Sequence, residues 1–335
     1  MGRSNPTVYD IAYRAGVSQA TVSRVLTGHA KVSDEKRAAV MAAIAAFDYK
    51  PNVMAQGLAR GRTRAIGVLT MSTESPYWGR LLRGIEQSLM GTGYRPLVAS
   101  VAGLGNPGEA LDMLLESQIE GLILLGGPMP EKTTQLVGEN FPVAGTGPVT
   151  PGLEPYFIQS DNTEGARLAT QHLLDLGHRR IALVTGPVDH SHALTRRRGY
   201  EMALSSAGVT VDETIIIHHG FNETMGAEAT KILLDRTRDF TAIFTTSDQV
   251  AYGVVLHLWQ QGIRVPDDVS IVGFDDQEHA RFTTPPLTTI RIPLLEMGEA
   301  LGKMIVSRID EDAVPWSPGE FATSLVIRQS TAPPR

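Results

Sequence analysis

The chain has 335 residues, which is long for one compact domain, and its composition is that of an ordinary soluble protein, with 42% apolar and 20% charged residues. It contains no cysteine, which excludes disulfides and thiolate metal sites and fits a reducing cytoplasm. The sequence holds no run of about 18 apolar residues and no signal-peptide pattern in residues 1–10, so we expect a cytoplasmic protein without a membrane span.

The net charge of −6 hides an uneven distribution of charged residues. Residues 1–62 hold nine Lys and Arg against four Asp and Glu, a net charge of +5, whereas the rest of the chain has a net charge of −11. A small basic head on an acidic body is typical of a protein in which only the head meets a polyanion such as nucleic acid. A basic surface without any partner is the alternative.

The pattern of the first 50 residues predicts three short helices. Gly16 allows the left-handed backbone conformation of a tight turn between the first and the second helix. Helix-capping residues predict where the helices begin, namely Thr7 (with Asp10 in the capping-box position), Ser18 and Ser33. Residues 53–60 could form a fourth helix, but a helix so short is marginal in water, and Gly57 weakens it further.

The second predicted helix has a polar surface that suits the major groove of DNA. Its short polar side chains and one arginine are Ser18, Gln19, Ala20, Thr21, Ser23 and Arg24. Arginine pairs with guanine and glutamine with adenine, alanine can contact a thymine methyl group, and hydroxyl groups bind phosphates. A helical bundle without a role in DNA binding is the alternative.

From residue 65 onward, short apolar strands alternate with amphipathic helices. The predicted strands are 66–70, 121–125, 181–185, 242–246 and 269–274, and predicted helices include 81–91, 163–176 and 249–261. This alternation is typical of parallel sheets covered by helices on both faces. About 270 residues are too many for one small sheet, so we expect two doubly wound lobes that divide near residue 160, with the C-terminal segment crossing between them.

Motifs along nearly the whole chain resemble the lactose/galactose repressor (LacI/GalR) family of transcription regulators. They include the helix-turn-helix stretch 8–26, Tyr49-Lys50-Pro51-Asn52, Ala55-Gln56-Gly57-Leu58-Ala59, the stretch 265–276 and Pro285-Pro286-Leu287-Thr288-Thr289-Ile290. The resemblance implies an all-α helix-turn-helix head plus an α/β periplasmic-binding-protein-like sensor of two doubly wound parallel-sheet lobes. We expect a helix-turn-helix DNA-binding domain over 1–50, a hinge helix and linker over 51–63, and a two-lobed effector-binding and dimerisation domain over 64–335.

For the head, the resemblance implies that Gln19, Ala20 and Arg24 contact base edges and that the hinge helix folds on DNA. Leu58 would then wedge into the minor groove, where unstacking a base step costs a few kcal/mol. Ordinary packing of Leu58 against the sensor is the alternative. The full set of expected DNA-binding residues is Thr7, Ser18, Gln19, Ala20, Thr21, Ser23, Arg24, Asn52 and Leu58.

Aromatic, acidic and basic residues follow the predicted strands of the body, where ligands of open α/β sheets bind. Aromatic faces pack on the C–H faces of a sugar, and charged groups hydrogen-bond to its hydroxyls, so we expect a saccharide, with a nucleoside or purine next. The resemblance implies that Tyr77, Trp78, Asp161, Arg196, Phe221 and Asp275 contact the effector, and we add Ser247 and His190, which lies in the loop before Arg196, to the expected effector-binding residues. Ser247 stands where relatives often have asparagine.

Several of these residues also have a purely structural explanation. Tyr77 and Trp78 could cap a core, and Arg196 could belong to a solvated charge run with Arg197 and Arg198. Asp161 could cap the following helix, and Asp275 could bind backbone amides at a turn. The histidines of 189–192 and of 218–219 lack a recognised metal-binding spacing, so we expect neither a metal nor a cofactor.

Together these patterns predict a sequence-specific DNA-binding transcription regulator, most simply a repressor, that acts as a homodimer and is controlled by a small effector bound between the sensor lobes. The alternative is a soluble sugar-binding protein without a DNA role, but it leaves the basic head unexplained. No nucleophile elbow, P-loop or metalloprotease motif occurs, so we expect no enzyme activity.

Overall fold

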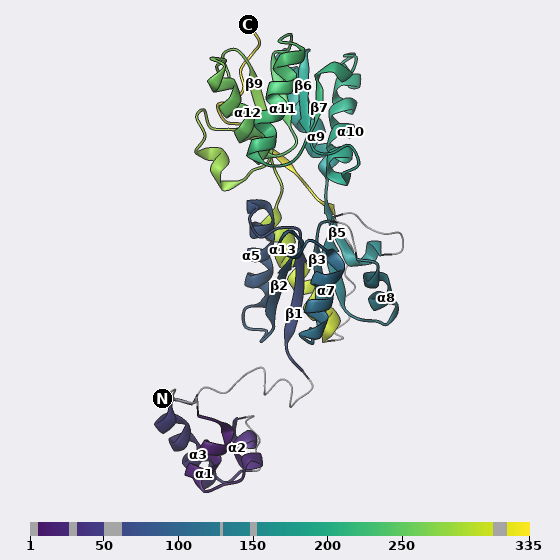
Figure 1. The fold of residues 1–335 in the computed structure, drawn as a ribbon. Helices are drawn as coiled ribbons and strands as arrows, with labels where there is room; N and C mark the ends of the chain where they lie inside the picture. Colours follow the sequence, from purple (N-terminus) through teal and green to yellow (C-terminus); the bar gives the residue numbers. More distant parts are fainter. Residues whose placement is uncertain (1–5, 27–31, 50–61, 128–129, 148–152, 311–319) are drawn as a thin grey trace. The chain divides into compact units, whose positions relative to one another are not determined.

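The computed structural model describes residues 6–26, 32–49, 62–127, 130–147, 153–310 and 320–335 (Figure 1). Contacts divide the chain into two compact units, Met1–Thr63 and Arg64–Arg335. The first is the helical head and the second is the α/β body, which itself consists of two lobes. No helix among the described residues is both long and apolar enough to cross a membrane.

The head consists of α1 (Val8–Ala15), α2 (Gln19–Leu26) and α3 (Asp34–Phe47) around a small apolar core. The buried side chains of this core are Ile11, Ala12, Val22, Val25, Val40 and Ala43. Gly16, with φ of 64°, makes the turn between α1 and α2, as the sequence predicts.

Capping bonds fix two of the three helix starts. The Asp10 carboxylate accepts the backbone N–H of Thr7 at 2.8 Å, and Ser18 Oγ accepts the backbone N–H of Thr21 at 3.2 Å. Ser33 precedes α3 as predicted, but its side chain makes no capping hydrogen bond. Asp34 and Glu35 in the first turn of α3 stabilise the start of this helix instead, because their negative charges lie at the positive end of the helix dipole.

The N-terminal lobe of the body is a six-stranded sheet in the order β11-β5-β4-β3-β1-β2, with every strand pair parallel. Its strands are β1 (Ala65–Thr70), β2 (Arg95–Ser100), β3 (Gly121–Leu125), β4 (Val143–Thr146), β5 (Phe157–Ser160) and β11 (Glu320–Phe321). Its helices are α5 (Pro76–Leu89), α6 (Val101–Leu104), α7 (Pro107–Glu116), α8 (Lys132–Gly138) and α13 (Leu294–Ile309), with the short 3-10 helix η1 (Glu154–Tyr156).

The C-terminal lobe repeats this plan with a sheet in the order β12-β10-β9-β8-β6-β7, in which only β12 runs antiparallel to its neighbour. Its strands are β6 (Ile181–Thr185), β7 (Ile216–His218), β8 (Ala242–Thr245), β9 (Ser270–Asp275), β10 (Thr288–Arg291) and β12 (Ser324–Val326). Its helices are α9 (Asn162–Asp175), α10 (Ser191–Ser206), α11 (Glu223–Arg236) and α12 (Asp248–Gln260), with the 3-10 helices η2 (Glu213–Ile215) and η3 (Glu278–Arg281).

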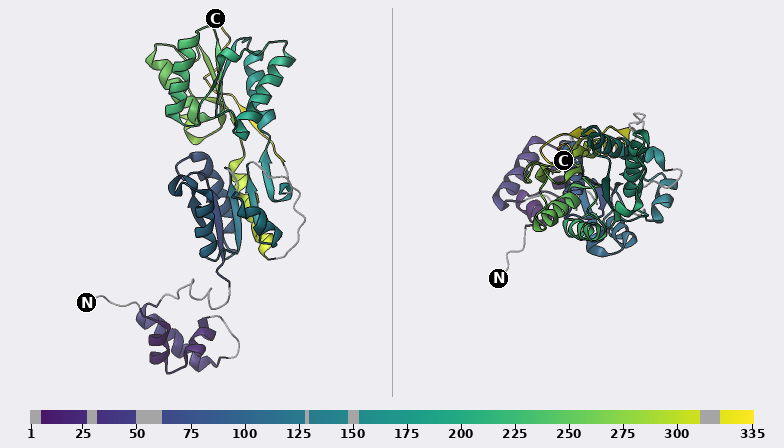
Figure 2. Two further views of the ribbon diagram at one scale, coloured as in Figure 1. Left: turned by 45° about the vertical axis from the view of Figure 1, so that its right-hand side comes forward. Right: turned by 90° about the horizontal axis from the view of Figure 1, so that it is seen from above.

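The chain crosses between the lobes three times, after β5, after β10 and between β11 and β12. Figures 1 and 2 show that the second crossing sends α13 back into the N-terminal lobe, where it packs beside α5. The two predicted lobes and the predicted C-terminal crossing are therefore confirmed.

Close helix packing fixes α5 and α10, the two helices that carry Tyr77, Trp78 and Arg196 of the cleft described below. A Cβ on Gly84 of α5 would lie 2.1 Å from the carbonyl oxygen of Leu295 in α13. A Cβ on Gly199 of α10 would lie 2.1 Å from the carbonyl oxygen of Thr163 in α9. Because only glycine fits at either crossing, α5 and α10 are held directly against their neighbours.

Candidate functional site

A cleft of about 1060 Å³ lies between the two lobes of the body, at the carboxyl ends of the strands. Seven of the eight residues that the sequence predicts for effector binding line it, namely Tyr77, Trp78, His190, Arg196, Phe221, Ser247 and Asp275. They come from both lobes and from segments nearly 200 residues apart. The placement follows from the parallel sheets, because the loops after neighbouring strands gather at one edge.

Asp161, the eighth residue, is not among the lining residues. Its carboxylate accepts the backbone N–H of Glu164 at 2.8 Å and so caps α9. This is the structural role that the sequence left open for Asp161. The neighbouring Asn162, rather than Asp161, contacts a cleft residue, because its Oδ1 accepts a hydrogen bond from Arg196.

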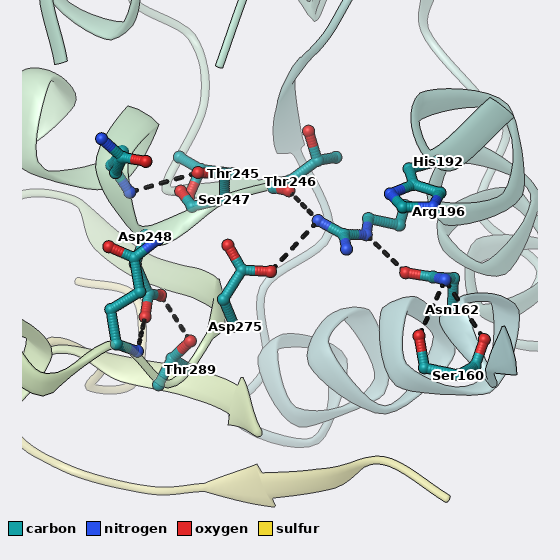
Figure 3. A network of polar contacts seen from close by, with 12 residues as sticks. Ser160, Asn162, His192, Arg196, Thr245, Thr246, Ser247, Asp248, Asp275 and Thr289 are labelled. Carbon is teal, nitrogen blue, oxygen red and sulfur yellow. Dashed lines mark hydrogen bonds and ion pairs between the residues drawn. The ribbon is translucent and has the colours of Figure 1, made fainter. Parts of the chain in front are cut away.

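Arg196 is the central cation of the cleft, with only 3% of its surface exposed. Figure 3 shows its guanidinium between Asn162 and Asp275. Nε donates to Asn162 Oδ1 at 2.8 Å, and Nη1 donates to the carbonyl oxygen of Thr246. The guanidinium carbon also lies 3.9 Å from the ring centroid of Phe274, a cation–π contact. Arg196 lies in the second turn of α10.

Asp275 ends β9 and lies opposite Arg196, with Oδ1 3.5 Å from Nη1. Burial raises the pKa of Asp275 to about 6, although the positive charge of Arg196 opposes the shift. The backbone of Asp275 is left-handed, with φ of 114°, and φ of the next residue, Asp276, is 51°. Two successive left-handed aspartates store backbone strain, which is characteristic of binding sites.

Aromatic rings form the walls on both sides of this ion pair. Tyr77 and Trp78, at the start of α5, pack edge to face with centroids 4.7 Å apart. Phe221 packs against His190 with centroids also 4.7 Å apart. Burial, together with the nearby Arg196, lowers the pKa of His192 to about 3, so this imidazole is neutral at physiological pH.

Several buried polar atoms on the cleft wall have no hydrogen-bond partner among the described residues. They are His190 Nδ1, Tyr252 Oη, Asp275 Oδ1 and both amide atoms of Gln277. Buried polar groups are normally paired, so their gathering here indicates a place for a polar ligand. Tyr252 and Gln277 were not predicted from the sequence, although Gln277 stands only two residues after Asp275, an aspartate at the end of a predicted strand.

Two hydrogen bonds join the lobes at the cleft. Ser75 Oγ donates to Gln249 Oε1 at 3.0 Å, and Arg80 Nη1 donates to the carbonyl oxygen of Asp276 at 3.0 Å. Both start in the N-terminal lobe and end in loops or helices that carry cleft residues. A change in lobe closure must therefore alter these contacts.

In the head, α2 and the residue before it carry most of the side chains that the sequence predicts for DNA contacts. Those on the surface are Ser18, Gln19, Ala20, Ser23 and Arg24, whereas Thr21 is half-buried and its hydroxyl lies 3.0 Å from that of Ser18. Thr7, at the start of α1, is also exposed. Asn52 and Leu58 lie outside the described residues, as does the expected hinge helix.

Comparison with known proteins agrees with both halves of the molecule. Residues 7–52 match the family described as "Bacterial regulatory proteins, lacI family", and residues 170–331 match the "Periplasmic binding protein-like domain". The ribose operon repressor of Escherichia coli K12 is 34% identical over 97% of this chain and 99% of its own. The transcriptional repressor PurR of Edwardsiella ictaluri is 33% identical over 97% of each chain.

A solved structure of the lac repressor dimer, bound to operator and an anti-inducer, is 30% identical with a TM-score of 0.86. The match covers 98% of this chain and 100% of that one. These relatives are transcriptional repressors, which confirms the expectation that the chain is not an enzyme. The chain belongs to the LacI family of bacterial regulatory proteins and is a DNA-binding transcription regulator, with a helix-turn-helix head and a two-lobed periplasmic-binding-protein-like body.

Proposed function

We propose that a neutral saccharide, bound in the cleft, controls how tightly the head binds operator DNA. The observation that carries this proposal is the buried Arg196–Asp275 pair, flanked by aromatic rings and by unpartnered polar atoms. Hydroxyl groups both donate and accept hydrogen bonds, so one ligand can satisfy a guanidinium and a carboxylate together. The rings of Trp78 and Phe221 offer apolar faces for the C–H groups of a sugar.

The charges of the cleft argue against an anionic effector. Among the described lining residues, Glu74, Glu223 and Asp275 are acidic, and Arg196 is the single arginine or lysine. Nε and Nη1 of the Arg196 guanidinium already donate to protein acceptors, which leaves Nη2 for a ligand. A phosphorylated or carboxylated ligand would therefore meet more negative than positive charge, which disfavours it in a site of low dielectric constant.

The similarity to a ribose operon repressor supports a small sugar, and the similarity to PurR makes a purine the second candidate. We propose that Tyr77, Trp78, His190, Arg196, Phe221, Ser247 and Asp275 contact the effector. Asp161 would act through the start of α9.

On the DNA side, we propose that the chain acts in the cytoplasm as a homodimer whose two heads contact two operator half-sites. The lac repressor dimer on its operator is the solved relative that supports this arrangement. Thr7, Ser18, Gln19, Ala20, Thr21, Ser23 and Arg24 would contact DNA from the head, and Asn52 and Leu58 from the hinge. The family match over residues 7–52 argues against a sugar-binding protein without a DNA role.

Thermal unfolding of the full chain with candidate effectors tests this proposal. D-Ribose, D-glucose, D-galactose, D-ribose 5-phosphate, hypoxanthine and adenosine would each be added at several concentrations. A neutral sugar should raise the melting temperature in a concentration-dependent way, since a ligand that binds only the folded state stabilises it. A shift with hypoxanthine or adenosine alone would replace the saccharide by a purine, and a shift with the phosphate alone would contradict the charge argument.

A further inference from the structure

Gln277 has an unusual environment for a glutamine. Only 1% of its surface is exposed, it lines the cleft, and neither Nε2 nor Oε1 has a hydrogen-bond partner among the described residues. A buried primary amide can make several hydrogen bonds, and leaving all of them unmade is strongly unfavourable. Within the protein the amide acts on the Asp275 carboxylate, whose pKa is raised by burial and which the amide helps to lower, but its own hydrogen-bonding capacity is left unmet, and a polar ligand in the cleft would meet it.

The backbone around Gln277 is held in place by Asp248, the first residue of α12. Asp248 Oδ2 accepts the backbone N–H of Gln277 at 2.7 Å, and Oδ1 accepts the hydroxyl of Thr289 at 2.5 Å. Figure 3 shows the second contact, which joins the start of α12 to β10. Asp248 is fully buried, and a Cβ on Gly273 would lie 2.3 Å from its Oδ1, so the carboxyl group has little room to move.

The preceding residue, Asp276, anchors the same loop from the other side. Its carboxylate forms ion pairs with Arg291 at 2.7 Å and Arg328 at 2.6 Å, and its carbonyl oxygen accepts from Arg80. These partners come from β10, from the segment after β12 and from α5 of the opposite lobe. The backbone on both sides of the Gln277 side chain is therefore fixed by charged and buried contacts.

The Gln277 amide also acts on the neighbouring carboxylate of Asp275, whose pKa it helps to lower against the effect of burial, and Asp275 Oδ1 faces Arg196 Nη1 at 3.5 Å without a hydrogen bond among the described residues. The two residues supply acceptors at Oδ1 and Oε1 and a donor at Nε2. Neighbouring hydroxyl groups of a sugar match this set, because each hydroxyl donates one hydrogen bond and accepts others. An ionised carboxylate or a phosphate dianion has no O–H to donate to Oε1 and would be repelled by Asp275.

We propose that Gln277 is an effector-recognition residue that selects a ligand with neighbouring hydroxyl groups, and that Asp248 is the positioning residue that fixes it. The proposal rests on the proposed function, since it names a contact within the same cleft. It adds a residue whose recognition chemistry differs from that of the Arg196–Asp275 pair, because the amide carries no charge. Effector choice would then depend on hydrogen-bond geometry at this position rather than on charge.

The test compares Gln277→Met with the wild-type full chain. Methionine has a similar size but cannot form the amide hydrogen bonds. Isothermal titration with D-ribose, D-glucose and D-galactose should show a dissociation constant raised at least tenfold for the sugar that binds best. Without sugar, the melting temperature of the variant should equal or exceed that of the wild type, because two unpaired buried atoms are removed. A purely structural glutamine would give the opposite result, a lower melting temperature.

Two further variants make the result specific. Gln261→Met, at the exposed end of α12, should leave both sugar affinity and melting temperature unchanged. Asp248→Ala should weaken sugar binding and Asp248→Asn should largely restore it, since asparagine keeps an acceptor for the Gln277 N–H. A series of monodeoxy analogues of the bound sugar would identify the hydroxyl group that Gln277 contacts. The analogue that lacks this hydroxyl should bind the wild type and Gln277→Met with equal affinity, because the contact is absent from both complexes.

The possible failures are distinguishable. If Asp275→Ala abolishes sugar binding but Gln277→Met binds within twofold of the wild type, the role of Gln277 is wrong and the cleft assignment stands. A ligand-free Gln277→Met that melts several degrees lower would equally overturn the recognition role. If none of the three sugars binds the wild type, the proposed function fails, and the hydroxyl-bearing ligand class named here fails with it.

Discussion

The recognition helix of the head and the effector cleft of the body present polar side chains in opposite ways. The side chains of α2 point outward into solvent from a helix whose apolar face fills a small core. In the cleft, Arg196, Asp275 and Gln277 are almost completely buried and are held by residues from several elements. An exposed polar surface suits a large polyanion that brings its own water and counterions, whereas a buried one suits a small ligand that must be desolvated.

This difference has a consequence for how the two sites respond to mutation. A surface side chain of α2 can be removed without disturbing the fold, so its loss should affect DNA binding alone. A cleft residue such as Asp275 is part of a buried charge network, so its loss affects its neighbours too. Loss of folding in the head should nonetheless leave the body folded, and the reverse, since each has its own apolar core.

The largest expected effect comes from the core of the head. Ile11→Ala removes a fully buried side chain from the small core of the head and should destabilise it by about 2–5 kcal/mol. Operator binding should be lost, while sugar binding and the melting of the body stay unchanged, as measured by fluorescence anisotropy and calorimetry. Met41→Ala, at an exposed position of α3, is the matched control. Loss of sugar binding in Ile11→Ala would mean that head and body do not fail separately.

A smaller effect is expected from the recognition surface. Arg24→Ala should weaken operator binding by about 1–3 kcal/mol per half-site and relax the sequence preference, because an arginine that pairs with a guanine is lost. Anisotropy titrations with an operator selected in vitro and with a scrambled duplex would measure both changes. Lys36→Ala, exposed on α3, should change binding to the two duplexes equally. Unchanged selectivity in Arg24→Ala would remove this residue from base recognition.

The smallest effect is one of pH on the cleft. Burial raises the pKa of Asp275 to about 6, so its carboxylate becomes protonated below that pH. Sugar affinity should therefore fall as pH drops below about 6, by at most about tenfold per pH unit, and Asp275→Asn should remove this dependence. The raised pKa also means that the empty body loses stability as pH rises from about 4 to 6, since the folded state binds the proton more tightly. Affinity that is flat between pH 5 and 7 would contradict an ionised Asp275 as ligand acceptor.

The sequence predicted those parts of the fold that are encoded locally. Strands β3 and β6 have both ends where the sequence placed them, because a strand buried on both faces is an unbroken apolar run. Strand β2 was not predicted, because it is an edge strand with half of its residues exposed, and neither was β7, which has only three residues. In the head, Gly16 and the capping residues marked the helices well because their action is local.

The cleft was predictable only in part. Strand ends and the family resemblance pointed to Asp275 and Arg196, but the same reasoning proposed Asp161, whose carboxylate caps α9 instead. Nothing in the sequence indicates that Gln277 and Tyr252 line a binding site, since a glutamine in a polar stretch and a tyrosine in a helix are common. That their polar atoms are buried and unpartnered is a property of the tertiary structure alone.

The central claim is that occupancy of the cleft sets the affinity of the head for DNA. Operator affinity should be measured for the full-length wild type and for Asp275→Ala, each without sugar and with a saturating concentration of the sugar that binds. Coupling of about 1–3 kcal/mol predicts that the sugar changes wild-type operator affinity roughly 5- to 150-fold and leaves that of Asp275→Ala unchanged. An Asp275→Ala variant whose operator affinity responds to the sugar as the wild type does would contradict the account.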